Sequence, residues 1–458
     1  MNFLFASIED LNDWIEPLGG HPQVRTPNLN RLAARGMVFR NAYATVPACS
    51  PSRTATLFGQ APWETGVYNN FQFWSDHYPP AQRLSLVGAM RDAGYATIGA
   101  GKIFHMDVRG IDPEDWTEFN TAAEHKKYPP ISQTVKTRAL RPMSDFGPDP
   151  TADPDENFDA ANTDWLCQRI QPGQDRQFWA FGLYRPHLPF IVPQEYFDLY
   201  PEQVDPPPGL GRKKFTPNFL KLQEGLPPES LDFINRRIGW VLHRMGEYNN
   251  FLRAYLASIS YADALFGKVL DRLEETGQID NTVIILWSDH GWQFGEKLAF
   301  RKFTLWERAL RVPLMISGPG IATGDCREPV SLLDLYPTLC RLSGATAKHR
   351  LDGEDLSPVL AGEPWQRPEP VISIWGKWEK DTPEGGRVAF SLRNKTHRYS
   401  CYWNGGEELY ESESDPFEHI NLLAHGDAGG NLRSLADGYQ AQINRLVPDL
   451  ADVAGWDG

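Results

Sequence analysis

The sequence predicts an α/β fold in which a large, mostly parallel sheet lies between layers of helices, followed by a small C-terminal α+β subdomain. The first observation is a set of short apolar runs that end in ionisable residues, which is typical of strands buried on both faces. These runs are Phe3–Ile8, Tyr95–Gly99, Phe178–Tyr184 and Thr282–Trp287. The second is that helical patterns lie between the runs. The third is a change in the sequence pattern after about Glu363, where short strand patterns begin.

The helical patterns are clearest in two stretches, Pro27–Arg35 and Phe251–Thr276. In the second stretch, Leu256, Ile259, Leu265, Val269 and Leu273 recur near helical spacing, so one face is expected to be buried. Alternating strands and helices predict helices on both faces of the sheet. In such folds a ligand binds beyond the carboxyl ends of the strands, where these runs carry their ionisable residues.

The C-terminal part of the chain reads as short antiparallel strands and one final helix. The strands are expected at Val371–Ile374, Arg387–Leu392, Tyr399–Trp403 and Glu408–Tyr410, and the helix at Asn431–Leu446. We therefore divide the chain into a catalytic domain, residues 1–365, and a C-terminal subdomain, residues 366–458. Two stretches with little periodicity, residues 106–158 and 193–240, are interpreted as insertions that shape the substrate cleft.

The composition excludes several classes of protein. The net charge of −14 argues against a nucleic-acid or membrane-surface binder, and it means that an anionic substrate needs a local cluster of basic groups. No apolar run approaches the length of a membrane span. The apolar start is too short for a signal peptide, so we expect a cytoplasmic protein, or a periplasmic or secreted one if an export signal was removed. The five scattered cysteines predict no disulfide framework.

Two of the strand ends carry candidate metal ligands. Glu9 and Asp10 follow the first run, and Asp289 and His290 follow the last. Oxygen-rich ligand sets favour a hard divalent cation, so we expect Ca²⁺, with Mg²⁺ or Mn²⁺ as alternatives. The alternative interpretation is that these carboxylates cap helices or lie in ordinary loops.

A further constellation is Cys49-Ser50-Pro51-Ser52-Arg53. Pro51 suits the first turn of a helix, which would place Cys49 at the helix N-terminus, where the dipole favours an anion. Arg53 would lie one turn along and could bind a tetrahedral oxyanion. Spacing alone predicts a thiolate nucleophile beside an anion site. The alternative is a buried cysteine at a helix start.

The basic groups for such an anion site are available at the other strand ends. Lys102 and His105 are three residues apart, on one side of a turn if that segment is helical. His187 follows Pro186, and Lys302 follows Arg301 in the loop after the Asp289-His290 pair. Each residue is weak evidence alone. Together with Arg53 they supply the positive charge that the site requires.

These residues resemble a known family. Cys49-Ser50-Pro51-Ser52-Arg53 followed by Leu57-Phe58-Gly59 is similar to the signature of type I sulfatases, Cys-x-Pro-Ser-Arg-x-x-x-Leu-Thr-Gly-Arg, in the alkaline-phosphatase-like superfamily. Other segments resemble the iduronate-2-sulfatase branch in particular. They are Gly101-Lys102-Ile103-Phe104-His105, Arg185-Pro186-His187-Leu188-Pro189-Phe190 and Ser288-Asp289-His290-Gly291-Trp292.

The resemblance implies a mechanism. A maturation enzyme would oxidise Cys49 to Cα-formylglycine, whose hydrate attacks sulfur. Glu9, Asp10, Asp289 and His290 would bind the cation, with Arg53 beside the hydrate. Lys102, His187 and Lys302 would bind the sulfate, His187 or Lys302 would protonate the leaving alcohol, and His105 would deprotonate the second hydroxyl.

The sequence departs from the family pattern at two positions. Glu9 stands where the first metal carboxylate is usually Asp, and Gln60 stands at the closing Arg of the signature.

The resemblance predicts hydrolysis of sulfate esters, with an O-sulfated carbohydrate as substrate. Five aromatic residues near the insertions could stack on sugar rings, although they could equally belong to the core. They are Trp63, Tyr68, Phe71, Phe73 and Trp74. The alternatives are a phosphonate or phosphodiester hydrolase of the same superfamily, and a degenerate, non-catalytic protein that binds sulfated glycans.

Overall fold

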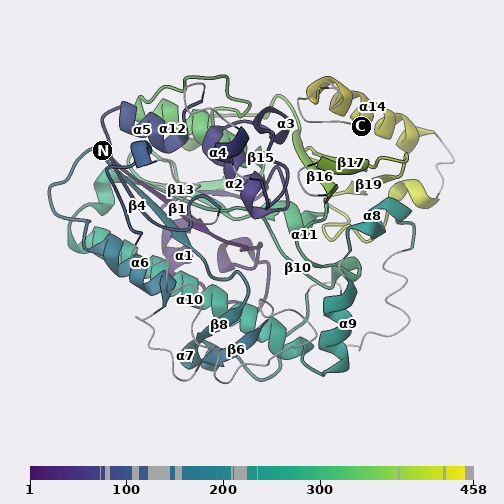
Figure 1. The fold of residues 1–458 in the computed structure, drawn as a ribbon, viewed down its shortest axis with the longest axis horizontal. Helices are drawn as coiled ribbons and strands as arrows, with labels where there is room; N and C mark the ends of the chain where they lie inside the picture. The colour runs from purple at the N-terminus through teal and green to yellow at the C-terminus, as the bar shows by residue number, and fades with distance from the viewer. Residues whose placement is uncertain are drawn as a thin grey trace.

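The centre of the molecule is a mixed eight-stranded sheet, in the order β14-β2-β13-β9-β1-β7-β4-β5. The computed structural model (Figure 1) describes residues 1–72, 74–77, 83–105, 113–121, 145–149, 157–207, 210, 224–234, 236–379, 382–425 and 430–448. The strands are β1 (Asn2–Ile8), β2 (Gly36–Phe39), β4 (Ala96–Gly101), β5 (Glu118–Phe119), β7 (Gln177–Leu183), β9 (Thr282–Ser288), β13 (Leu314–Ser317) and β14 (Gly324–Cys326).

The expected apolar runs form the middle of this sheet. They correspond to β9, β1, β7 and β4, which are neighbours and parallel. Only β13 runs antiparallel to its neighbours in the described sheet. The expectation of a mostly parallel sheet is therefore confirmed. Because these strands are parallel, their carboxyl ends meet at one edge.

Both faces of the sheet are covered by helices, as expected. Along β1, Phe3 and Phe5 pack into one core, whereas Leu4, Ala6 and Ile8 pack into the other. The first core lies under α2 (Cys49–Phe58), α5 (Leu86–Asp92) and α12 (Leu335–Ser343), and the second under α1 (Pro27–Ala33), α6 (Phe158–Cys167) and α10 (Tyr248–Glu275). The continuous apolar runs are thus explained by burial on two faces.

A second sheet lies in the C-terminal part of the chain. It is antiparallel, in the order β16-β17-β18-β19, and α14 packs against it (Figure 1). The elements are β16 (Val371–Glu379), β17 (Thr382–Arg393), β18 (His397–Cys401), β19 (Glu407–Glu411) and α14 (Asn431–Leu446). The final helix has the expected bounds, whereas β18 begins and ends two residues before the expected Tyr399–Trp403. The boundary at residues 365/366 stays a prediction.

The two stretches that we interpret as insertions, residues 106–158 and 193–240, contain short helices and strands. In residues 106–158, β5 joins the edge of the main sheet, and β6 (Phe146–Asp149) pairs with β8 (Phe190–Pro193). Residues 193–240 include α7 (Gln194–Asp198), α8 (Pro228–Asp232) and the start of α9 (Arg236–Arg244). Their role in the cleft stays a prediction.

The remaining short elements of the described chain include two small sheets, β10-β11 and β12-β3-β15, and four short helices. They are β3 (Ala42–Tyr43), α3 (Pro62–Thr65), α4 (Trp74–His77), β10 (Gln293–Phe294), β11 (Phe300–Arg301), α11 (Glu307–Leu310), β12 (Arg311–Val312), β15 (Val330–Ser331) and α13 (Ser357–Leu360). None of the helices in the described part of the chain is both long and apolar enough to cross a membrane.

Candidate active site

The carboxyl ends of the parallel strands bring the predicted metal ligands together. Glu9 and Asp10 follow β1, and Asp289 and His290 follow the adjacent β9; all of them are fully buried. Asp10 has a positive φ of 55°, a conformation that few non-glycine residues adopt. In this conformation its backbone N–H donates to Asp289 Oδ1 (3.1 Å), and its carbonyl accepts from the Tyr255 hydroxyl (2.7 Å).

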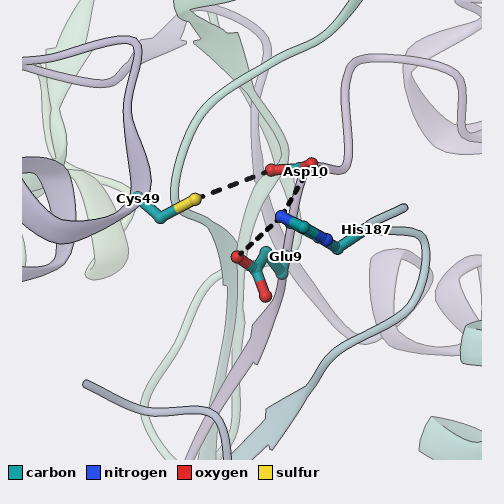
Figure 2. Close-up of side chains that lie close together, drawn as sticks. All are labelled: Glu9, Asp10, Cys49 and His187. Carbon is teal, nitrogen blue, oxygen red and sulfur yellow. Dashed lines mark hydrogen bonds and ion pairs between the residues drawn. The ribbon is translucent and has the colours of Figure 1, made fainter. Parts of the chain in front are cut away.

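Cys49 is the first residue of α2, as predicted, with Ala48 as the N-cap residue. Its Sγ lies 2.8 Å from Lys302 Nζ, 3.3 Å from His290 Nε2 and 3.9 Å from Asp10 Oδ1. Figure 2 shows the sulfur directed towards Asp10, with His187 between Asp10 and Glu9. The cysteine therefore faces the carboxylate cluster.

Arg53 lies one turn further along α2 and is fully buried. Its Nε donates to Asp289 Oδ2 (3.0 Å), and its Nη1 donates to the carbonyls of Lys102 (2.7 Å) and Ile103 (3.0 Å). Its Nη2 is buried and has no hydrogen-bond partner among the described residues. Arg53 thus ties α2 to the ends of β9 and β4 and keeps one donor available for a ligand.

Two lysines bring positive charge to the carboxylates. Lys102 Nζ donates to Glu9 Oε1, and Lys302 Nζ donates to Asp10 Oδ1 (2.8 Å). Residues 102–105 form a bend, so the helical turn considered for Lys102 and His105 is not present. Lys302 belongs to the irregular segment after β11, and it bridges the cysteine and the metal-ligand cluster.

The histidines differ in position. His187 Nε2 lies 3.9 Å from Glu9 Oε1 and 3.8 Å from Asp10 Oδ2. His290 Nε2 lies 3.2 Å from Asp10 Oδ1. His105 is half-buried, and its Nδ1 has no hydrogen-bond partner among the described residues. Burial lowers the pKa of His105 well below its usual range, and the charge of Lys102 acts in the same direction.

The electrostatics of the cluster follow from burial and from the charges. Burial would raise the pKa of Glu9, but Lys102 and His187 outweigh this effect and hold that pKa well below its usual range. Burial likewise opposes ionisation of Asp289, and Arg53 and His290 overcome it, so the pKa of Asp289 is also lowered. Burial lowers the pKa of His187 to about 3, which leaves the imidazole neutral. Burial raises the pKa of Asp10, against the opposing charge of Lys302. The negative Glu9 and Asp289 and the neutral His187 are in the forms that bind metal ions.

The thiol of Cys49 is a different case. Burial raises its pKa well above the ordinary value, although Lys302 opposes the shift. The thiolate predicted from spacing is therefore wrong for the unmodified side chain, because the spacing did not reveal how completely Cys49 is buried. A protonated thiol is a poor nucleophile.

The cluster has the donor atoms that a divalent cation requires. Glu9, Asp10, Cys49 and His187 form one group whose ligand atoms lie within 4.8 Å of one another, and Asp10, Cys49, Asp289 and His290 form another. Glu9 Oε2 and Asp10 Oδ2 are buried with no hydrogen-bond partner in the described part of the chain. Buried carboxylate oxygens are costly without a partner, so these residues fit a cation.

Sequence reasoning missed several residues that support the site. The Tyr255 hydroxyl on α10 also accepts from the Asn12 N–H (3.0 Å). Asp159 accepts from the N–H groups of Tyr184 and Arg185 (2.6 and 2.9 Å), next to His187. Helical periodicity assigned α10 to the core, and no motif marked Asp159. Gln60, which stands at the closing Arg of the signature, is buried directly after the αL residue Gly59.

With this geometry in view, comparison with known proteins identifies the family. The sulfatase family model matches residues 1–345. The chain belongs to the sulfatase family. A sulfatase of Formosa agariphila is 33% identical over 449 residues, covering 92% of this chain and 82% of the relative. Iduronate 2-sulfatase of Mus musculus is 27% identical over 527 residues, covering 95% and 93%.

Solved structures agree on the sulfatase fold. A phosphonate monoester hydrolase of Agrobacterium radiobacter superposes with a TM-score of 0.78 at 20% identity, covering 97% of this chain and 95% of that chain. The fold class expected from the sequence is confirmed, including the C-terminal antiparallel sheet. The family and the curated relatives make this sulfatase a sulfuric ester hydrolase.

Proposed function

We propose that this sulfatase hydrolyses an O-sulfate ester of a carbohydrate, with Cα-formylglycine formed from Cys49 and one bound divalent cation. The observation that carries the proposal is the position of Cys49. Its Sγ lies 2.8 Å from Lys302 Nζ and 3.3 Å from His290 Nε2, beside carboxylate oxygens that have no hydrogen-bond partner among the described residues.

The cation would be held by Glu9, Asp10, Asp289 and His290, and Ca²⁺ is the ion that suits mostly oxygen ligands. It would supply positive charge to the anionic ester oxygens. The extra methylene of Glu9 is compatible with this role. One of its oxygens pairs with Lys102, and the other remains available for the cation.

Formylglycine would supply a hydrated aldehyde, with one hydroxyl to attack sulfur and a second through which sulfate can leave without renewed attack by water. The residues around it have separate tasks. Arg53 Nη2 and Lys102 hold the sulfate oxygens, because their charges stabilise the anion in a buried site. His105, kept neutral by burial, accepts the proton of the second hydroxyl.

Lys302 holds the proton for the leaving alcohol. Burial would lower the pKa of this amine, but the Asp10 carboxylate raises it above the usual range, so the amine is cationic at neutral pH. His187, by contrast, is neutral. Of the two candidates for the general acid, Lys302 is the group that carries a proton when the ester binds.

The carbohydrate substrate is supported by a relative and by one exposed ring. The relative named iduronate 2-sulfatase covers nearly the whole chain. Phe71 is 80% exposed, and its neighbours Asn70 and Gln72 accept hydrogen bonds from Ser50, next to Cys49. Tyr68 and Trp74 are buried core residues, Trp63 is partly buried, and Phe73 lies outside the described residues. Among the members of this set that the structure describes, Phe71 is the most exposed, and its ring could stack on a sugar.

The test combines a mass measurement with turnover. The peptide that contains Cys49, from a host with the maturation enzyme, should show the mass of the aldehyde. The same preparation should hydrolyse sulfated oligosaccharides with a higher kcat/KM than matched phosphodiesters or phosphonates. An unmodified thiol with full turnover would contradict the formylglycine. A preference for phosphonates would favour a phosphonate hydrolase of the same superfamily. Glycan binding without turnover would favour a degenerate, non-catalytic protein that binds sulfated glycans.

A further inference from the structure

Lys302 reaches the site from a strained hairpin. The strands β10 and β11 pair antiparallel, with Gln293 opposite Arg301 and Phe294 opposite Phe300, and Lys302 follows directly. Four non-glycine residues around this turn have positive φ. They are Lys297 (53°), Leu298 (62°), Arg301 (72°) and Phe303 (77°). Such conformations persist only where the surroundings over-determine them.

The tip of the hairpin is held by a buried lysine that does not belong to the candidate metal cluster. Lys297 is 1% exposed, and its Nζ lies 4.4 Å from the ring centroid of Trp306 and 4.0 Å from that of Tyr410. It donates to the Tyr410 hydroxyl (2.8 Å) and lies 3.8 Å from Glu408 Oε2. Aromatic faces and a carboxylate together form a cage for a cation.

The cage joins two parts of the chain that are far apart in sequence. Glu408 and Tyr410 lie on β19 of the C-terminal sheet, whereas Trp306 precedes α11. The Trp306 indole N–H donates to Glu408 Oε2 (2.7 Å), and the Tyr402 hydroxyl donates to Glu408 Oε1 (2.9 Å). Lys297 precedes Lys302 in the sequence and Trp306 follows it, and both contact the Glu408 carboxylate.

We propose that Lys297 is a positioning residue that fastens the strained hairpin to the C-terminal sheet and so places the Lys302 amine against residue 49 and the substrate. A buried cation is expensive, and its best-attested use is to specify one arrangement over others. A neutral side chain of similar volume would fill the cage without fixing the register of the hairpin. The inference rests on the proposed function in taking Lys302 to contact the ester.

A kinetic double-mutant cycle tests this coupling. We expect Lys297→Met to lower kcat for a sulfated oligosaccharide, whose alcohol leaving group needs the proton of Lys302, by about tenfold to a hundredfold, because a displacement of about 1 Å at a reacting group can cost that much. KM should change little. In a Lys302→Met background the same substitution should change kcat less than about twofold, since residues that act as one unit are not additive.

Two further variants make the cycle decisive. Arg398→Met removes another buried cation of the C-terminal sheet, one that pairs with Glu307 and Glu418; it should lower the unfolding midpoint while leaving kcat unchanged below that midpoint. Tyr410→Phe removes the hydroxyl that accepts from Lys297, and it replaces Lys297→Met in the cycle if that variant does not fold.

If the losses of kcat in Lys297→Met and Lys302→Met multiply in the double variant, the inference is overturned. An unchanged kcat in Lys297→Met would also overturn it. If the wild-type enzyme prefers a phosphonate, the proposed substrate class fails, and the cycle is measured on that phosphonate. If it turns over neither ester, the proposed function fails as a whole. The Kd of inorganic sulfate is then measured by calorimetry for the same set of variants. We expect the effects of the two substitutions on this Kd to be non-additive as well.

Discussion

Two buried charged clusters in this sulfatase differ in how their carboxylates are satisfied. In the cluster between α11 and the C-terminal sheet, every carboxylate oxygen of Glu307, Glu408 and Glu418 has a hydrogen-bond partner. Glu307 accepts from the Tyr43 hydroxyl and from Arg398, and Glu418 accepts from Arg398 and from the Glu307 N–H. Glu408 accepts from the side chains of Tyr402, Trp306 and Tyr410.

The active-site cluster is equally buried but is not closed in this way. Glu9 Oε2 and Asp10 Oδ2 are buried carboxylate oxygens with no hydrogen-bond partner in the described chain. A structural cluster that is left half-satisfied destabilises the fold, whereas a binding site keeps polar atoms for its ligands. We therefore expect the C-terminal cluster to contribute to stability, whereas the unpaired atoms of the active-site cluster fit the proposed cation and anionic ester.

If the two clusters have these separate roles, the largest expected effect of a substitution is on turnover. Replacing Cys49 with alanine should lower kcat by about 10⁴-fold or more, because the nucleophile is lost. The thermal unfolding midpoint should stay close to that of the wild type. Steady-state kinetics and a thermal scan on the same preparation measure both. Retained turnover would mean that residue 49 is not the nucleophile, and a collapsed midpoint would mean that Cys49 serves stability.

The opposite result is expected for the C-terminal cluster. Arg398 is 1% exposed and pairs with Glu307 and Glu418 at 2.6 Å. Arg398→Met should cost about 3–5 kcal/mol of unfolding free energy, because it leaves uncompensated buried carboxylates. Urea unfolding gives this value. A loss of kcat in the folded variant, measured well below its unfolding midpoint, would contradict these separate roles.

The same cluster predicts a pH dependence of stability. Burial would raise the pKa of Glu307, but Arg398 and Arg393 outweigh it and lower that pKa from 4.5 to about 2. The ion pairs therefore stabilise the fold above about pH 4.5, and this contribution, about 3 kcal/mol, is lost as the pH falls towards 2. Glu307→Gln should thus be less stable than the wild type at pH 7, with the gap closing at low pH. A gap that is independent of pH would contradict the ion-pair account.

The smallest expected effect lies at the rim of the active site. Phe71→Ala should lower kcat/KM for a sulfated oligosaccharide by about threefold to tenfold, the loss expected for one ring-stacking contact, with no change in unfolding. Ile420→Ala is the matched control, since that side chain is also exposed, at 53%, and lies outside the predicted cleft insertions. Equal losses in the two variants would remove the specific role of Phe71.

Much of the fold was predictable because burial on both faces leaves continuous apolar runs. Those runs became four adjacent parallel strands, so the residues that follow them meet at one edge. This is why Glu9, Asp10, Asp289, His290 and Lys102 could be grouped from the sequence. The Cys49 motif added the helix start, and the structure confirms it.

The features of the site that could not be predicted depend on contacts between residues far apart in the sequence, which no local sequence pattern encodes. The Tyr255 hydroxyl binds the Asp10 carbonyl across 245 residues, and the helical stripe of α10 identifies Tyr255 only as a core residue. Lys297 looks like a solvent-exposed lysine until β19 is placed beside it. Spacing also could not reveal that burial keeps the Cys49 thiol protonated.

We expect the active-site cluster to be complete only when a divalent cation binds. The most direct test of this expectation is the unfolding free energy of metal-free enzyme as Ca²⁺ is added, in the wild type, Asp10→Asn and Glu418→Gln. At a hundredfold excess over Kd, Ca²⁺ should stabilise the wild type and Glu418→Gln by about 2.7 kcal/mol and Asp10→Asn by far less. Equal stabilisation of all three proteins, or none of the wild type, would contradict this expectation.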